Sequence, residues 1–232
     1  MTNSSENLSK VSCSMIPVMA EPICRFTLPN QIHQGFKAIA HAIVDKAPSE
    51  TRRIGNGRQE HICNTAHQHI FKDFPEIKTL ENIISTMGLK YIDYLGYLCD
   101  EVIVTDAWLN NGKKNSILQD HNHANSYISG TYYIEIDSKI HSQLEFDNHK
   151  LSYEGAFGPS LKLPVNTKKA TPYNSKRISI ESLPGQILFW KSHMIHGFSR
   201  PNLEDGRLTL SFNIMPKVCK NDGGVFSFSL SS

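Results

Sequence analysis

Hydrophobic residues recur at helical spacing in two segments of the first hundred residues. In segment 31–46 they are Phe36, Ile39, Ala40 and Ile43. In segment 76–99 they are Ile77, Leu80, Ile84, Met87, Tyr91, Leu95 and Leu98. A spacing of three and four residues places these side chains on one face of a helix. The pattern therefore predicts two amphipathic helices. Pro48 marks the end of the first, and the second tolerates Gly88.

The pattern changes after residue 100 to short runs rich in β-branched and aromatic residues. These runs are EVIVTDAWLN, YISGTYYIEI, SQLEF, QILFW and RLTLSFNIM. Turn signals separate them, among them Asn111-Gly112, Pro184-Gly185 and Asp205-Gly206. Helices followed by strands favour the α+β class. Strands this short and numerous favour a double-stranded β-helix, or jelly roll, with the N-terminal helices packed on one sheet.

The organisation of the chain follows from the same pattern. Residues 1–24 lack periodicity and are interpreted as a flexible tail. Residues 25–232 are predicted to form a single domain, helical over 25–99 and jelly-roll over 100–216. Within the helical part, residues 52–73 are interpreted as loop with a short helix. The segment 149–177 is rich in Gly, Pro, Lys and Asn, which is typical of a lid, a binding loop or disorder.

Composition narrows the classes of function. The chain has 232 residues, of which 39% are hydrophobic and 20% charged, and a formal net charge of +2. This charge is too small to favour nucleic acid as a partner. No apolar run approaches the roughly 18 residues of a membrane span, so no membrane partner is expected. The five scattered cysteines, Cys13, Cys24, Cys63, Cys99 and Cys219, favour reduced thiols and a cytoplasmic location.

Two histidines one residue apart are the first candidate site. His121 and His123 lie just before a predicted strand, and residues i and i+2 of a strand point to the same face. On that reading Asp120 and Asn122 point outward. Two imidazoles alone bind a metal weakly, so a third ligand from another strand is needed. The alternative is that both histidines lie in a solvated loop.

The third ligand is sought among the histidines that follow the QILFW run. A hairpin centred between Pro201 and Asn202 places His196 opposite Arg207, so that the two share one face. The same register turns His193 to the other face. We therefore predict His121, His123 and His196 as metal ligands. The second H-x-H pair, His67 and His69, has no strand pattern or distant partner and is interpreted as structural.

These motifs together resemble the Fe(II)/2-oxoglutarate oxygenases of the prolyl-hydroxylase-like branch. The matching positions are His121, Asn122, His123, Ser129, Gly130, Tyr132, Tyr133, His196, Arg207, Ser211, Phe212 and Asn213. The resemblance spans residues 100–214 and implies Fe(II) and 2-oxoglutarate as cofactors, with release of succinate and CO2. It also implies that Arg207 holds the far carboxylate of 2-oxoglutarate, a task that suits a planar guanidinium. Thr209 is expected to assist it, and Tyr133 either does so or belongs to the core.

One feature departs from the wider superfamily, in which H-x-D or H-x-E is usual. Here His123 stands at the carboxylate position, so the site is either three-histidine or has water in place of one ligand. Trp108, Asn110 and Asn213 are candidates for the substrate pocket, although packing is an alternative role. The substrate is expected to be a small molecule or a peptide.

Two other functions stay open at this point. One is a cupin-like metalloenzyme that does not use 2-oxoglutarate, and the other is a non-catalytic jelly-roll binding domain.

Overall fold

The computed structural model describes residues 20–55, 57–65, 68–148, 166, 168–169, 171–220 and 227–229. Both predicted helices are confirmed. The α-helices and 3-10 turns of this part are α2 (Asn30–Lys46), η1 (Ser49–Thr51), α3 (Ile70–Asp73), η2 (Pro75–Ile77) and α4 (Lys78–Tyr94). Helix α4 is shorter than the predicted segment 76–99. It ends where Gly96 turns the chain with a φ of 81°, a conformation that favours glycine.

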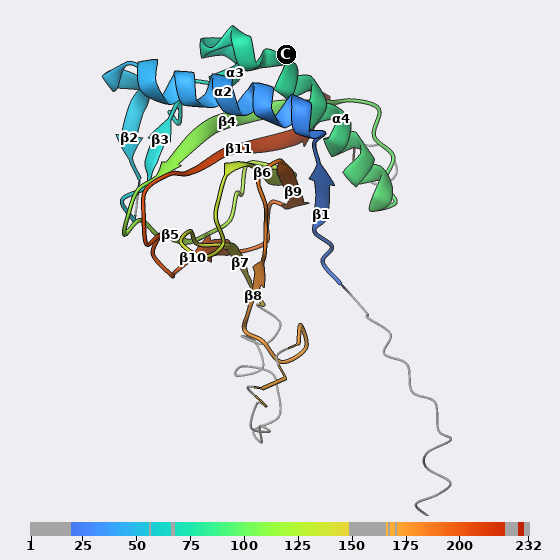
Figure 1. Cartoon of the computed structure of the whole chain (residues 1–232). Helices are drawn as coiled ribbons and strands as arrows, with labels where there is room; N and C mark the ends of the chain where they lie inside the picture. The colour runs from blue at the N-terminus through green and yellow to red at the C-terminus, as the bar shows by residue number, and fades with distance from the viewer. Residues whose placement is uncertain are drawn as a thin grey trace, which may run out of the picture.

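The described strands form two facing sheets, and all of their pairings are antiparallel (Figure 1). The major sheet runs in the order β1 (Cys24–Thr27), β9 (Gln186–Lys191), β6 (Ile128–Glu135), β11 (Arg207–Pro216), β4 (Val102–Gly112), β3 (Glu60–Ile62) and β2 (Arg52–Ile54). The minor sheet runs in the order β5 (Leu118–His121), β10 (His196–Phe198), β7 (Leu144–Asp147) and β8 (Arg177–Ile180). Strands β12 (Val218–Lys220) and β13 (Ser227–Ser229) form a separate pair. This architecture confirms the predicted α+β class with a jelly-roll core.

The helices cover only the outer face of the major sheet, as Figure 1 shows. Helix α2 contacts β6, and α3 and α4 contact β4. The larger hydrophobic core lies in this layer, where Phe36, Ile43 and Ile84 meet residues of the sheet. A smaller cluster that includes Leu144, Phe146 and Trp190 lies between the two sheets. The inner face of the major sheet is therefore free to carry polar side chains.

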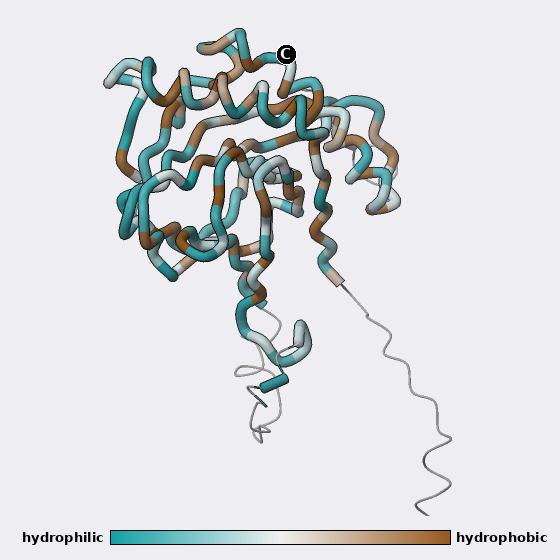
Figure 2. The backbone as a smooth tube through the Cα atoms, in the orientation of Figure 1, coloured by the Kyte–Doolittle hydropathy of each residue, from teal (hydrophilic) through white to brown (hydrophobic). Residues whose placement is uncertain are grey.

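Strand β11 shows how the sequence assigns these two faces. Leu208, Leu210, Phe212 and Ile214 alternate with polar residues and belong to the core beneath the helices. The intervening Arg207, Thr209 and Ser211 line a cavity between the sheets. Figure 2 shows the corresponding mixture of hydrophobic and hydrophilic positions along the sheet strands. Because side chains alternate with a period of two, a slip of one residue would exchange the two faces.

Two predictions about the N-terminal part need correction. The segment 52–73, interpreted as loop with a short helix, contains the hairpin β2–β3 as well as α3. Cys24 was assigned to the flexible tail, yet it opens β1 and pairs with Phe189; residues 1–19 of that tail lie outside the described residues. These short strands carry little periodicity of their own. The edges of the large sheet decide their structure.

Two predictions about the C-terminal part were also wrong. Asn111-Gly112 is not a turn, because β4 continues through both residues. Strands β10 and β11 do not form a hairpin: His196 pairs with His121 and Phe146, whereas Arg207 pairs with Gly112. A jelly roll sends consecutive strands to opposite sheets, so these two segments face one another across the interior. Most of the predicted 149–177 segment lies outside the described residues.

No helix in the described part of the chain combines the length and the apolar character that a membrane span requires.

Candidate metal and cosubstrate site

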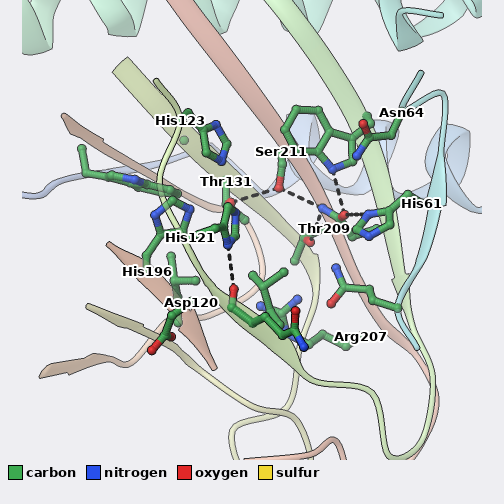
Figure 3. Close-up of a pocket in the computed structure, with 18 of the residues that line it drawn as sticks. His61, Asn64, Asp120, His121, His123, Thr131, His196, Arg207, Thr209 and Ser211 are labelled. Carbon is green, nitrogen blue, oxygen red and sulfur yellow. Dashed lines mark hydrogen bonds between the residues drawn. The ribbon is translucent and has the colours of Figure 1, made fainter. Parts of the chain in front are cut away.

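A cavity of about 390 Å³ lies between the two sheets. Strands β3, β4, β6 and β11 form its major-sheet wall, and β5 and β10 contribute from the minor sheet. The three predicted histidine ligands lie on one side of the cavity, and Arg207, Thr209 and His61 lie on the other (Figure 3). The site thus has two chemically different ends.

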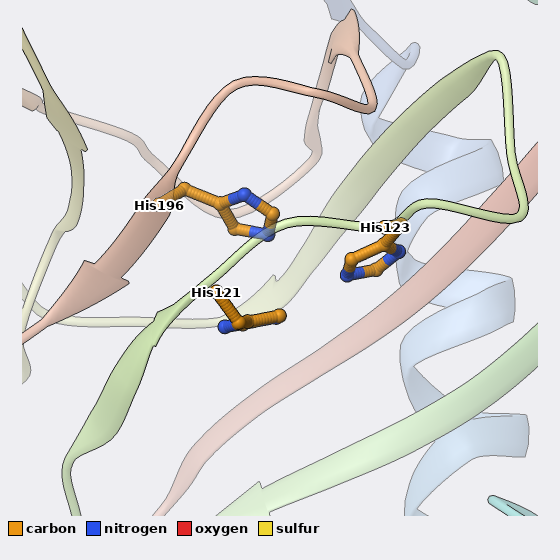
Figure 4. A group of neighbouring side chains, drawn as sticks. All are labelled: His121, His123 and His196. Carbon is orange, nitrogen blue, oxygen red and sulfur yellow. The ribbon is translucent and has the colours of Figure 1, made fainter. Parts of the chain in front are cut away.

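The three histidines meet although they come from two distant segments (Figure 4). His121 closes β5 and pairs directly with His196 of β10, which places their Cβ atoms on one face of the minor sheet. His123 lies beyond the end of β5, contrary to the prediction of a shared strand, and its backbone N–H donates to Ser192 O at 3.0 Å. One ring nitrogen of each histidine lies within 4.8 Å of the other two. Nitrogens gathered in this way can hold one metal ion.

Hydrogen bonds orient each of the three rings. Nδ1 of His121 donates to the carbonyl oxygen of Gln119 at 2.7 Å, and Nδ1 of His196 donates to that of Met194 at 2.8 Å. Nδ1 of His123 donates to Oδ1 of Asn213 at 2.5 Å. Because all three acceptors are oxygen atoms, the proton is held on Nδ1 and Nε2 keeps its lone pair. This is the arrangement by which proteins prepare histidine for metal binding.

The environment also keeps these imidazoles neutral. Burial and the neighbouring His121 lower the pKa of His196 to about 3. Burial likewise lowers the pKa of His123, although the bond to Asn213 opposes the shift. Metal ions bind the neutral form of histidine, so the site is ready for a cation at neutral pH.

A buried polar cluster supports His123 from behind. Ser129 Oγ lies 3.1 Å from Nδ1 of His123, 2.9 Å from Oδ1 of Asn213 and 2.9 Å from Oγ of Ser192. Asn213, a candidate for the substrate pocket, does not line the cavity and instead positions this ring. Its amide nitrogen donates to Asp106 at 3.4 Å, which fixes its oxygen toward His123.

The glycine of the S-G-x-Y-Y motif has a packing role beside this cluster. A Cβ at Gly130 would lie 2.2 Å from the ring of Phe212 and 2.7 Å from the carbonyl oxygen of Leu188. No side chain fits between these neighbours, so β6 requires glycine at this point.

Arg207 dominates the opposite end of the cavity. Its side chain is only 2% exposed, and its Nε donates to the carbonyl oxygen of Ser142 at 3.0 Å. The guanidinium carbon lies 4.8 Å from the centre of the Phe198 ring and 5.8 Å from that of Tyr133. Within the described part of the chain no acidic group lies within 4.0 Å of the guanidinium group, so Arg207 is not an ordinary salt-bridge residue. Burial lowers the pKa of Arg207, and a buried cation of this kind calls for an anionic ligand.

The other two predicted cosubstrate residues take different positions. Thr209 lines the cavity, and its oxygen accepts a hydrogen bond from Asn110 Nδ2 at 3.3 Å. Tyr133 is fully buried beside Arg207 and is not part of the cavity wall. Tyr133 therefore lies beside the guanidinium group, outside the cavity.

Asn110 lines the cavity and is the centre of a polar network. Its Oδ1 accepts from Nδ1 of His61 at 2.6 Å and from Nε1 of Trp108 at 2.9 Å. Its Nδ2 donates to Ser211 at 2.8 Å. Trp108 in turn stacks beside His123, with ring centres 6.2 Å apart. Both predicted pocket residues therefore line the cavity, with Asn110 fully engaged by protein partners.

The N-terminal hairpin contributes to the cavity in a way that was not predicted from the sequence. Arg53, Gln59, His61 and Asn64 come from β2, β3 and the adjoining turns and line the cavity wall. None of them belongs to a recognisable motif. The only available signal was the proximity in sequence of several polar residues to a short strand pattern.

Four further residues carry predictions: Asp120, His193, His69 and His67. Asp120 is among the residues that line the cavity, and its carboxylate accepts two hydrogen bonds from Arg177, of 2.6 and 2.8 Å. The hydrogen bond from Arg177 lowers the pKa of Asp120. His193 has a side chain 56% exposed and lies outside the cavity, as predicted. His69 is buried at the start of α3, which confirms its structural role, and His67 lies outside the described residues.

Comparisons with known proteins agree with this geometry. The model of a family described as "Putative 2OG-Fe(II) oxygenase" matches residues 106–213. No curated protein matches the sequence significantly.

Solved structures share the fold at low identity. A prolyl-4-hydroxylase from Pseudomonas putida is 10% identical with a TM-score of 0.52, and the alignment covers 84% of this chain and 92% of that one. The epimerase SnoN from nogalamycin biosynthesis is 12% identical with a TM-score of 0.62, over 85% and 77% of the two chains. HygX from Streptomyces hygroscopicus, solved with nickel and 2-oxoglutarate, is 13% identical with a TM-score of 0.53, over 84% and 83%.

The family match covers residues 106–213, slightly less than half of the chain, and shows that this jelly-roll segment is similar to the 2-oxoglutarate- and Fe(II)-dependent oxygenases. Oxygenases of this class use Fe(II) and 2-oxoglutarate as cofactors. His121, His123 and His196 form a donor set that could hold the metal ion.

Proposed function

We propose that His121, His123 and His196 bind Fe(II) and that Arg207 and Thr209 bind the far carboxylate of 2-oxoglutarate. The observation that carries this proposal is the pairing of two ends in one cavity. One end has three imidazoles with free Nε2 atoms, and the other has a buried guanidinium without an acidic partner. A 2-oxo diacid, which chelates a metal at one end and carries a carboxylate at the other, complements both.

The three-histidine set has an electrostatic consequence. Three neutral ligands leave the full double charge of the bound metal in the site, whereas the usual carboxylate would cancel part of it. The dianion of 2-oxoglutarate then balances the metal at one end and Arg207 at the other, and this attraction is strong in a cavity that excludes most water.

The residues of the chain position the reactants. Bound Fe(II) and 2-oxoglutarate supply the oxidising chemistry, in which 2-oxoglutarate is converted to succinate and CO2. His121 and His196 would hold the metal from the minor sheet, and His123, oriented by Asn213, would be the third ligand. Trp108 stacks beside His123, and its hydrogen bond to Asn110 orients the Trp108 ring.

We further propose that the reaction is a hydroxylation of a small molecule or a peptide. A cavity of about 390 Å³ lies within the range of small-molecule sites. We also propose that residues 25–232 act as one domain. A reducing, cytoplasmic setting would preserve the thiols of Cys24 and Cys63, which the structure shows as free.

The test is a stepwise loading of the protein. Under anaerobic conditions we expect one Fe(II) per chain, a change in its optical spectrum on addition of 2-oxoglutarate, and succinate once air is admitted. Iron binding without any response to 2-oxoglutarate would favour a cupin-like metalloenzyme. A protein that binds no stoichiometric iron would be a non-catalytic jelly-roll domain.

A further inference from the structure

Gln59 is a buried polar residue whose side chain makes no hydrogen bond with the described residues. The residue is 2% exposed, and its Oε1 is buried without a partner. It nevertheless lies on the wall of the cavity. Buried amides are almost always hydrogen-bonded, so an unsatisfied one on a cavity wall indicates a ligand. The oxygen and nitrogen of a glutamine amide exchange places when the amide rotates by half a turn, so Gln59 can present the N–H donors of Nε2 to an acceptor in the cavity.

The sheet register places Gln59 and Arg207 in one row, that is, at paired positions across the neighbouring strands β3, β4 and β11. Strand β3 pairs Glu60 with Asn111 and His61 with Asn110, and the continuation of this ladder puts Gln59 opposite Gly112. Gly112 pairs in turn with Arg207 of β11. Two strand spacings amount to roughly 10 Å between the backbones, and both side chains are long enough to approach a common point between them.

The middle position of this row has no side chain to separate the two. A Cβ at Gly112 would lie 2.8 Å from Nδ2 of Asn202 and 3.0 Å from Cβ of Arg207. The row Gln59–Gly112–Arg207 therefore requires glycine at its centre. The neighbouring row, His61–Asn110–Thr209, brings Thr209 to the same end of the cavity.

The hairpin that carries Gln59 is held in place by backbone contacts. Gly55 N–H donates to the carbonyl oxygen of Gln59 at 2.8 Å and closes the turn. Ile117 N–H donates to that of Gly57 at 2.8 Å and ties the turn to the segment before β5. Gly57 has a φ of 82°, and a Cβ there would lie 2.4 Å from the oxygen of Ile117. Gln59 thus has a defined position in the wall.

We propose that Gln59 is a third hydrogen-bond donor to the far carboxylate of 2-oxoglutarate, beside Arg207 and Thr209. This inference rests on the proposed function. A carboxylate offers about four acceptor sites on its two oxygens. In Arg207 the Nε–H group donates to the carbonyl oxygen of Ser142, which leaves the terminal N–H groups for a ligand. In Thr209 the hydroxyl oxygen accepts from Asn110, which leaves the hydroxyl proton for a ligand. The amide of Gln59 adds the donor that completes the set.

The inference also gives the N-terminal hairpin a role in selectivity. Gln59 lies outside residues 106–213, the segment that matches the oxygenase family. The family segment provides the metal ligands and the cation, and the hairpin adds a neutral contact that only a ligand with a second carboxylate can use. Gln59 is therefore a determinant of selectivity for diacids over 2-oxo monoacids.

The experiment is calorimetric titration of Ni(II)-loaded protein with 2-oxoglutarate and with 2-oxopentanoate, which lacks the far carboxylate. For Gln59→Met, which keeps the length and loses the amide, we expect about tenfold weaker binding of 2-oxoglutarate, equivalent to about 1.4 kcal/mol. Binding of 2-oxopentanoate should stay within twofold of wild type. Gln59→Glu keeps the shape but repels the carboxylate, so its loss should be about 100-fold. Gln34→Met, at an exposed position of α2, is the matched control and should bind as wild type.

The outcomes separate the two proposals. If the wild-type protein does not bind 2-oxoglutarate, the proposed function fails. If it does bind and Gln59→Met binds equally well, only the role of Gln59 is overturned. Equal losses for both ligands in a variant with unchanged Ni(II) affinity would also overturn it, because they would indicate a general disturbance of the cavity. Should Gln59→Met fail to fold, the same comparison of the two ligands is made with Gln59→Glu.

Discussion

The two ends of the cavity differ in how far the protein satisfies its own groups. At the metal end each imidazole has an oxygen acceptor for its Nδ1 proton, and burial keeps His123 and His196 neutral. At the arginine end a cation is buried with one carbonyl acceptor and no carboxylate among its described neighbours. At the metal end the protein therefore satisfies the Nδ1 protons itself, and the Nε2 atoms can bind a cation. The arginine end is electrostatically incomplete until an anion arrives.

This contrast predicts that the two ends fail independently. Ligands at the metal end should control metal affinity, and residues at the arginine end should control 2-oxoglutarate affinity without changing that for the metal.

Removal of a metal ligand should have the largest effect. In His196→Ala we expect metal affinity to fall by at least 100-fold, since one of three protein ligands is lost from a buried position. Titration with Zn(II) or Fe(II), followed by metal analysis after gel filtration, measures this. His193→Ala is the control, because that exposed histidine lies outside the cavity. Equal metal binding by wild type and His196→Ala would remove His196 from the site.

Replacement of the buried cation should affect the other end alone. In Arg207→Met we expect 2-oxoglutarate to bind about 100-fold more weakly, or by about 2.7 kcal/mol, with metal affinity unchanged. The ligand-free variant should unfold at the same temperature as wild type or higher, because an unpaired buried charge is replaced by an apolar side chain of similar length. A lower unfolding temperature together with wild-type cosubstrate affinity would contradict both expectations.

The support behind His123 should have a smaller effect than the ligands themselves. In Asn213→Leu the acceptor that orients His123 is lost, and we expect metal affinity to fall by about tenfold. Affinity for 2-oxoglutarate, measured at saturating metal, should stay near that of wild type. A loss confined to 2-oxoglutarate would instead place Asn213 at the opposite end of the cavity.

A fall in pH should gradually lower the stability of the metal-free protein, because of His196 at the metal end. The pKa of His196 is lowered from 6.5 to about 3 in the folded state, so the unfolded chain binds its proton first. Stability is therefore lost as the pH falls from about 6.5 towards 3, by roughly 1 kcal/mol per pH unit for this histidine. Urea unfolding at a series of pH values measures the slope. The slope should be shallower in His196→Leu, and an unchanged slope would show that His196 does not titrate in this way.

The positions of the site residues were predictable where the sequence carries a motif. His121, His123 and His196 were identified from spacing and resemblance, and Arg207 with Thr209 from their place at the start of a strand. The reasoning for His196 was nevertheless wrong in its register, since it assumed a hairpin between β10 and β11. Both residues line one cavity because their strands face each other in opposite sheets, a relation that no local pattern contains.

The contributions of Gln59 and Asn213 could not be read from the sequence. Asn213 lies in a recognisable motif, yet its side chain supports a ligand and does not line the cavity. Gln59 lies in a segment interpreted as loop, and its importance depends on the pairing of β3 with the edge of β4.

The helices, the main strands and the apolar face of each strand follow from residue spacing along the chain. The residue types in the motifs also indicate which side chains we propose to bind Fe(II) and a diacid. Tertiary structure alone decided that β5 and β10 pair, that the hairpin β2–β3 extends the major sheet, and that Arg207 is buried without an acid. These facts depend on contacts between residues far apart in the chain, where the packing of two sheets outweighs any local preference.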